Sequence, residues 1–340
     1  MLKTILGRIR EFFARLFRRA PPAPGYFVPG HKMSLWGWVR VAPWVPPTRE
    51  YLLYIPRGHG GWKRHPLLVM IHGCRQTPEE FASATRIAAL ADEHGWLVLL
   101  PRQTDKANKW SCWNWLDHAT SAGRGEAAIV AAQVKSVRRS HRVDHARVFI
   151  AGFSSGGALA AAVAVHYPGL FAGAFVHSAL ACGAASSPAR ALKVMREGAN
   201  TNSARIGVAA RVGAGGDVRL PIVIVHGEQD DVVAAANARD VVRQFLALNG
   251  YPQARAEAKE LPAPDAERRV ALGADRSITT SDYRAGERMA VRLVRISGLQ
   301  HAWSGGDAAF PYNDERPPDA TALLGEAMRA AVDGASLRGT

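Results

Sequence analysis

The chain has 340 residues, 48% of them hydrophobic, which is enough to bury a sizeable core in one large domain. Its formal net charge is +14, from 43 Lys and Arg against 29 Asp and Glu. No recognition motif for nucleic acid accompanies that charge and no internal repeat is evident, so we expect neither a nucleic-acid partner nor a repeat architecture.

The first predicted element is a basic amphipathic helix over residues 1–20. Apolar side chains recur at helical spacing from Leu2 to Phe17, and six Lys and Arg against the single acid Glu11 give the segment a net charge of +5. Such a helix lies on an anionic membrane, a granule or a partner surface, or else its apolar stripe packs on the chain's own core. It is too charged to span a bilayer, and it lacks the uninterrupted apolar region and cleavage site of a standard signal peptide.

Residues 21–33, rich in proline and glycine, are expected to be a linker, and residues 34–340 the main domain. That domain opens with a β-rich region over 34–56. Two later segments carry little signal: 201–218 is interpreted as an insertion near the site, and 252–288 as an irregular excursion from the core.

Between these segments, strand patterns alternate with helical ones. Strands are predicted near 67–71, 96–100, 147–151, 172–177, 222–226 and 290–296, and helices near 78–93, 124–140, 155–166, 187–197, 235–248 and 319–334. The alternation predicts an α/β fold with a mainly parallel sheet and helices on both faces.

A serine stands at the apex of Gly152-Phe153-Ser154-Ser155-Gly156, between a predicted strand and a predicted helix. G-x-S-x-G in this setting is a nucleophile elbow. The glycines are expected because a side chain would clash in so sharp a turn and because glycine tolerates strained dihedrals. The alternative is a chance match of common residues, so the rest of a catalytic triad must decide.

An acid and a base follow in the order that α/β-hydrolases require, Ser, then Asp or Glu, then His. Asp230 lies on the loop after the strand near 222–226, and His301 lies on a glycine-rich loop after the strand near 290–296. Asp230 could instead be a turn residue or a helix N-cap, and Asp231 competes for either role. We favour Asp230 as the triad acid because of its spacing from the strand.

The loop after the strand near 67–71 is expected to supply main-chain donors for an oxyanion. The amides of Cys74 and Ser155 are the predicted donors, with Gly73 as the alternative to Cys74. His72 could be a metal ligand, but no second ligand stands at zinc-like spacing, so we expect it to brace the loop. We expect no metal and no cofactor.

Five motifs together resemble the polyhydroxybutyrate (PHB) depolymerase family of α/β-hydrolase esterases, which is similar to feruloyl and acetylxylan esterase catalytic domains. They are the segment from His72 to Pro78 with Phe81, Cys112-Trp113-Asn114-Trp115, the elbow with Gly157, His226-Gly227-Glu228-Gln229-Asp230 with Val233, and the segment from Gly298 to Gly306. The resemblance spans about residues 48–330. Members often carry a glycine where Gln300 stands and an aromatic residue where Cys182 stands.

The resemblance implies further features of the site. Trp113, Trp115 and Trp303 are candidates for lining the substrate pocket. Cys74 and Cys112 are placed on loops that flank the active site, so a disulfide between them is implied and would suit an exported enzyme. The alternative is two reduced thiols in a cytosolic protein, at a membrane or granule surface if the first helix docks there.

These observations predict a serine esterase whose catalytic domain, residues 34–340, hydrolyses carboxylic esters through Ser154, His301 and Asp230 and an acyl-enzyme. Poly- or oligo-hydroxyalkanoates and other short-acyl esters are the substrate classes that the resemblance implies. The alternative is a non-catalytic protein of the same fold that docks to a membrane or polymer granule through its first helix.

Overall fold

The computed structural model describes residues 24–33, 48–60, 62–199, 203–251 and 260–333. Its centre is a ten-stranded sheet in the order β1-β2-β4-β3-β5-β6-β7-β10-β9-β8. The strands are β1 (Tyr26–Met33), β2 (Thr48–Ile55), β3 (His65–Ile71), β4 (Leu97–Pro101), β5 (Val143–Phe153), β6 (Gly173–His177), β7 (Ile222–Gly227), β8 (Ala266–Ala271), β9 (Ser277–Ala285) and β10 (Arg288–Ile296).

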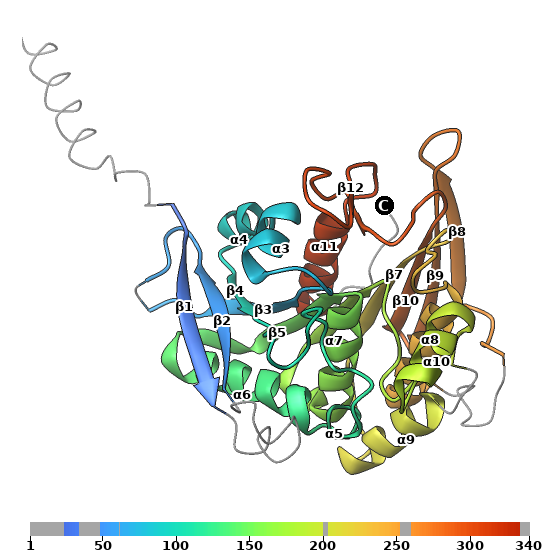
Figure 1. Ribbon diagram of the computed structural model, residues 1–340, viewed down its shortest axis with the longest axis horizontal. Coiled ribbons are helices and arrows are strands. Elements are labelled where there is room, and N and C mark those ends of the chain that lie inside the picture. The colour runs from blue at the N-terminus through green and yellow to red at the C-terminus, as the bar shows by residue number, and fades with distance from the viewer. Residues whose placement is uncertain (1–23, 34–47, 61, 200–202, 252–259, 334–340) are drawn as a thin grey trace, which may run out of the picture.

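The six strands from β4 to β10 in the sheet order pair in parallel, and antiparallel strands extend the sheet at both edges. Helices cover both faces (Figure 1). They are α3 (Pro78–Ala84), α4 (Ile87–His94), α5 (His118–Ser121), α6 (Gly125–Ser140), α7 (Ser155–His166), α8 (Pro188–Glu197), α9 (Ser203–Gly213), α10 (Ala236–Leu248) and α11 (Ala320–Asp333). The predicted α/β-hydrolase architecture is therefore confirmed.

The strand β3 shows how the sequence builds two cores from one sheet. Leu67, Val69 and Ile71 face the cluster that α6, α7 and α10 complete, while Leu68 and Met70 face the cluster that α3, α4 and α11 complete. Both faces are buried, so the strand is apolar throughout rather than alternating, as parallel central strands are.

Several predicted boundaries are wrong. Residues 26–33 are not linker but the edge strand β1, paired antiparallel with β2. The helix predicted over 78–93 is two helices, because Arg86 takes a left-handed conformation with φ of +52° between α3 and α4.

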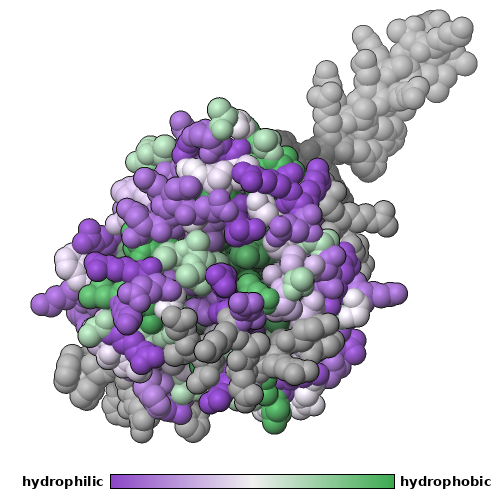
Figure 2. Space-filling model, turned by 90° about the vertical axis from the view of Figure 1, so that its right-hand side faces the viewer, coloured by the Kyte–Doolittle hydropathy of each residue, from purple (hydrophilic) through white to green (hydrophobic). Residues whose placement is uncertain are grey.

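The segment 252–288, interpreted as irregular, contains β8 and β9. The side chains of β8 are almost all exposed, and hydrophilic residues cover much of this face of the molecule (Figure 2), so the strand has no apolar pattern to reveal it. The segment 201–218 contains α9, whose Gly207 lies so close to α10 that a Cβ would stand 2.2 Å from the Gln244 carbonyl oxygen.

Two predicted features lie outside the described residues: the amphipathic helix over 1–20, and the part of the β-rich region that precedes Thr48. In the ranges that the structure describes, no helix is long and apolar enough to cross a membrane.

Candidate active site

The strand β5 turns into α7 through Ser154, which has φ of +55° and ψ of −122°. A Cβ on Gly152 would lie 2.3 Å from the Gly156 carbonyl oxygen, and one on Gly156 would lie 2.2 Å from that of His72. The glycines are thus required by close approach, as predicted, but the strained dihedral lies on the serine itself. That strain lifts the Ser154 side chain off the end of the strand, next to the N-terminus of α7.

Ser154, His301 and Asp230 form a continuous chain of hydrogen bonds. The Oγ atom of Ser154 lies 2.9 Å from Nε2 of His301, and Nδ1 of His301 lies 2.8 and 3.0 Å from the two carboxylate oxygens of Asp230. The three residues follow β5, β10 and β7, whose carboxyl ends meet at the same edge of the sheet. His301 therefore donates from Nδ1 to Asp230 and accepts at Nε2 from the serine hydroxyl.

Asp230 is held as an ionised acceptor. Its Oδ1 also accepts the main-chain N–H groups of Val232 and Val233, at 3.1 and 2.8 Å. Burial by itself raises the pKa of the Asp230 carboxyl, but the hydrogen bond and charge of His301 outweigh burial and hold that pKa below its ordinary value. The neighbouring Asp231 is exposed.

Two further histidines, to which the sequence analysis gave no role, are fully buried beside Ser154, His301 and Asp230. His226 donates from Nε2 to the Val233 carbonyl at 2.7 Å, and His177 stacks on Trp303 and accepts the Ser304 N–H at 3.3 Å. Burial lowers the pKa of His177 to about 3, so it is neutral at pH 7. Both lie at the carboxyl ends of buried strands, which is the sequence signal that could have identified them.

The opposite side of the site is the loop after β3. The Gly73 N–H is occupied by Oε1 of Gln76 at 2.8 Å, whereas within the described ranges the N–H groups of Cys74 and Ser155 have no hydrogen-bond partner. His72 uses both ring nitrogens, donating from Nδ1 to the Gly73 carbonyl and accepting the Gln103 N–H at Nε2. A second use of that imidazole as a metal ligand would break these bonds, and the described residues contain no group of three or more metal-ligating side chains.

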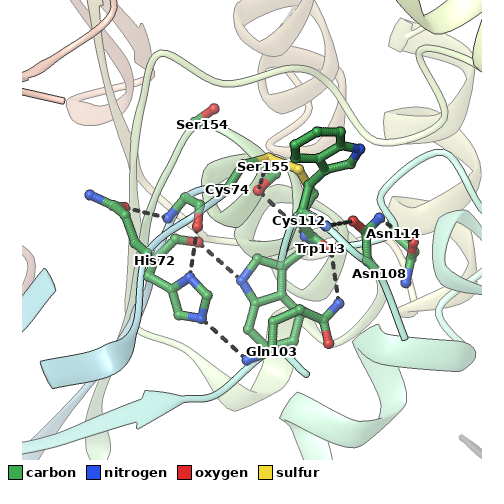
Figure 3. Close-up of a disulfide and its surroundings, with 12 residues drawn as sticks. His72, Cys74, Gln103, Asn108, Cys112, Trp113, Asn114, Ser154 and Ser155 are labelled. Carbon is green, nitrogen blue, oxygen red and sulfur yellow. Dashed lines mark hydrogen bonds between the residues drawn. A yellow bond between two sulfur atoms is a disulfide. The ribbon is translucent and has the colours of Figure 1, made fainter. Parts of the chain in front are cut away.

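A disulfide joins Cys74 to Cys112 above this loop (Figure 3). The Cys74 sulfur lies 3.3 Å from Oγ of Ser155. The main-chain N–H of Trp113 donates to the same oxygen, with an N-to-O distance of 3.4 Å. The third cysteine, Cys182, is buried, and burial raises the pKa of its thiol to about 12.

The three tryptophans that the resemblance implies as pocket candidates are buried. Trp113 and Trp303 are each 1% exposed, and Trp115 is 9% exposed. The Trp113 indole donates to the His72 carbonyl at 3.0 Å, and the Trp303 indole donates to Thr321 at 3.1 Å. A buried indole with its N–H satisfied braces the loops around it.

The chain is similar in sequence to known esterases. Residues 49–262 match the family described as esterase PHB depolymerase. Poly(3-hydroxyalkanoate) depolymerase C of Paucimonas lemoignei is 33% identical over 211 residues, 61% of this chain and 50% of the depolymerase, so the chain spans about half the length of that relative. Feruloyl esterase B of Thermothelomyces thermophilus is 27% identical over 206 residues, 58% of this chain and 70% of the esterase.

Among solved structures, an acetyl xylan esterase from Aspergillus awamori superimposes with a TM-score of 0.62. It covers 81% of this chain and 94% of its own length at 21% identity. At that identity the likeness establishes a shared fold.

Proposed function

The chain belongs to the esterase PHB depolymerase family, and from this premise we propose that it is a serine esterase whose triad is Ser154, His301 and Asp230. The observation that carries the proposal is the unbroken chain of hydrogen bonds from carboxylate to imidazole to serine hydroxyl. In this arrangement Nδ1 of His301 donates to Asp230, and Nε2 of His301 faces the serine hydroxyl that it must deprotonate.

In the proposed mechanism Ser154 Oγ attacks the ester carbonyl carbon and its proton passes to Nε2 of His301. The amides of Cys74 and Ser155 donate to the oxyanion, because the alternative donor, Gly73, is already bonded to Gln76. The imidazolium then protonates the leaving alcohol, and water repeats the cycle on the acyl-enzyme. Asp230 holds the tautomer and stabilises the imidazolium throughout.

The proposed substrates are short-acyl esters, including hydroxyalkanoate oligomers. Two relatives are named as a poly(3-hydroxyalkanoate) depolymerase and a feruloyl esterase. These names support a carboxylic ester as the substrate, and the two esters they imply differ in the leaving alcohol. A panel of p-nitrophenyl butyrate, hydroxybutyrate oligomers, and acetyl and feruloyl sugar esters would rank the classes.

Labelling by an organophosphonate tests the reaction type directly. We expect the phosphonate to modify Ser154 alone, to abolish ester hydrolysis in step with labelling, and to leave a Ser154→Ala variant unlabelled. A protein that is neither labelled nor hydrolytic would instead support the non-catalytic alternative.

We also propose that residues 1–20 dock the enzyme to an anionic surface, and that the Cys74–Cys112 disulfide suits an oxidising compartment. Deleting residues 1–24 should weaken binding to anionic vesicles, because each lost base near the surface removes about 1 kcal/mol of attraction. The deletion should leave turnover of a soluble ester within about twofold. Neutral vesicles are the control, and equal binding by both proteins at low salt would reject the anchor.

A further inference from the structure

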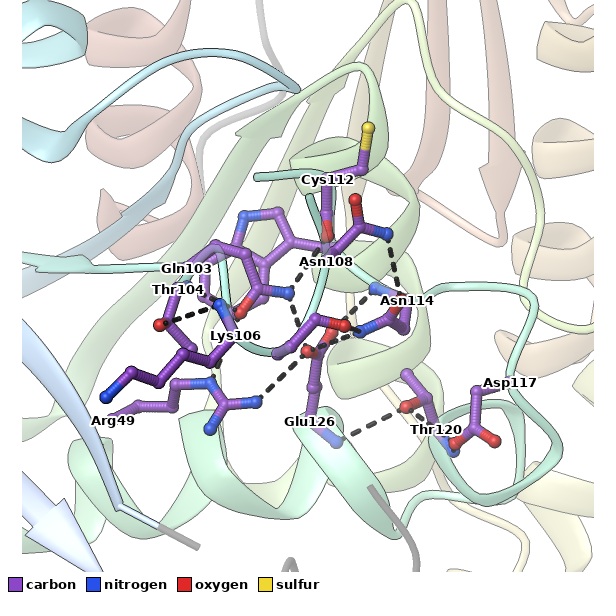
Figure 4. A network of polar contacts seen from close by, with 12 residues as sticks. Arg49, Gln103, Thr104, Lys106, Asn108, Cys112, Asn114, Asp117, Thr120 and Glu126 are labelled. Atoms are coloured by element: carbon purple, nitrogen blue, oxygen red, sulfur yellow. Dashed lines mark hydrogen bonds and ion pairs between the residues drawn. The ribbon is translucent and has the colours of Figure 1, made fainter. Parts of the chain in front are cut away.

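A buried carboxylate lies beneath the Cys112–Trp115 loop and outside the triad. Glu126, in the first turn of α6, is 1% exposed. Its carboxylate accepts hydrogen bonds from Nε2 of Gln103 at 2.6 Å, from the main-chain N–H of Asn114 at 2.6 Å and from Nδ2 of Asn114 at 3.0 Å (Figure 4). Nη2 of Arg49 lies 3.4 Å from the same carboxylate. One side chain therefore ties together β2, the end of β4 and the loop after it.

The first branch of this network runs through the loop to the disulfide. Asn114 is bonded to Glu126 by both its main chain and its side chain, and the Cys112 carbonyl accepts Nε2 of Gln103 at 2.9 Å. Cys112 is in turn bonded to Cys74. The disulfide thus fixes the position of the Cys74 side chain.

The second branch runs through an imidazole to the main chain beside Cys74. The Gln103 N–H donates to Nε2 of His72 at 3.2 Å, and Nδ1 of His72 donates to the Gly73 carbonyl at 2.7 Å. Burial lowers the pKa of His72 to about 4, so the ring is neutral and keeps its proton on Nδ1. The tautomer follows from the Gln103 N–H, which can only donate.

The Gly73 carbonyl and the Cys74 N–H belong to the same planar peptide unit and point in opposite directions. The hydrogen bond from His72 holds the Gly73 carbonyl on the side of the loop where His72 lies. The Cys74 N–H is therefore directed to the opposite side of the loop, away from His72. Resting on the function proposed above, we propose that Glu126, acting through Gln103 and His72, is a positioning residue that orients the Cys74 N–H in the oxyanion hole.

The chemistry of the site explains why the residue is a glutamate. Every group that faces the carboxylate is a donor: the two amide NH₂ groups of Gln103 and Asn114, a main-chain N–H, and a guanidinium. A glutamine of the same size would turn an NH₂ group towards another donor and break at least one branch. Glu126→Gln is therefore a sharp perturbation with almost no change in volume.

The test compares p-nitrophenyl butyrate with its thiono analogue, in which sulfur replaces the carbonyl oxygen. The anion that forms on sulfur accepts hydrogen bonds poorly, so the oxo-to-thiono ratio of kcat reports the oxyanion donors. We expect Glu126→Gln and His72→Phe to lower kcat on the oxo ester by about 10–100-fold, with KM within about threefold and a clearly smaller fall on the thiono ester. The ratio should drop by about tenfold in both variants.

Two controls separate positioning from general damage. Asp230→Asn impairs the triad and should lower both rates by the same factor, leaving the ratio unchanged. Asp282→Asn breaks a second, largely buried carboxylate–arginine pair, which Asp282 in β9 forms with Arg292 in β10 at 2.6 Å, and it should leave both the ratio and kcat close to wild type.

An unchanged ratio in folded Glu126→Gln and His72→Phe, on a wild-type enzyme that hydrolyses the oxo ester, would overturn this inference alone. A wild-type protein without activity and without phosphonate labelling would instead overturn the proposed function. Should Glu126→Gln not fold, the ratio of His72→Phe decides, because phenylalanine fills the buried volume and removes both hydrogen bonds.

Discussion

The two sides of the candidate active site are built by different means. The side with the proposed triad consists of three side chains that contact one another directly and follow the ends of strands in one sheet. The oxyanion side consists of main-chain amides, and side chains from β2, α6 and two loops hold one of them, Cys74, in place. Chemistry carried by side chains needs few supports, whereas chemistry carried by the backbone needs the backbone itself to be fixed.

The largest effect should follow from removing the nucleophile on the triad side. Ser154→Ala is expected to lower kcat by about 10⁵–10⁶-fold, with the residual rate supplied by the oxyanion donors and substrate binding. Steady-state hydrolysis of p-nitrophenyl butyrate measures it, after treatment with phosphonate to remove any contaminating esterase. Near-normal turnover would show that another residue carries the reaction.

The next effect concerns the acid. Asp230→Asn should lower kcat by about 10⁴-fold, because the amide no longer holds the Nδ1 proton of His301 in the productive tautomer. Asp231→Asn, one residue along the chain and exposed, is the matched control and should change kcat by less than about twofold. Reversal of the two results would place the acid at Asp231.

A smaller effect on rate should follow from loosening the oxyanion side. Breaking the Cys74–Cys112 bond, by reduction or by Cys112→Ala, removes a link over a separation of 38 residues and should destabilise the fold by about 4 kcal/mol. The rate should fall by about tenfold in folded protein, since Cys74 keeps its second support through His72. Three free thiols in protein made under oxidising conditions, counted after unfolding without reductant, would contradict the bridge.

The smallest predicted effect concerns the pH dependence of the free energy of unfolding. His72 on the oxyanion side has a pKa lowered to about 4, well below its unfolded value of about 6.5. The unfolded chain therefore binds the extra proton as pH falls below about 6.5, and stability is lost down to about pH 4 at about 1.4 kcal/mol per pH unit. Urea unfolding at several pH values should show that His72→Phe lacks this part of the slope.

His177, on the triad side, provides the comparison. Its pKa is lowered to about 3, so its contribution to the slope should continue about one pH unit further into acid than that of His72. A slope that is the same in wild type and His72→Phe would mean that the imidazole is not buried as a neutral group.

The sequence alone predicts the triad side of the proposed site. Apolar runs indicate where strands end, and in a parallel sheet the loops after those runs meet at one edge. The sequence therefore predicts that Ser154, Asp230 and His301 lie together. The glycines of the elbow followed from the same local geometry.

The oxyanion side depends on contacts that form only in the folded chain. Which amide remains available depends on what binds its neighbours, and Gln76 removes Gly73 from the choice. Arg49 and Glu126 meet across 77 residues of chain, and no periodicity along the sequence reports such a contact. The burial of the three tryptophans is a further example, because a motif gives the identity of a side chain while packing decides whether solvent or protein surrounds it.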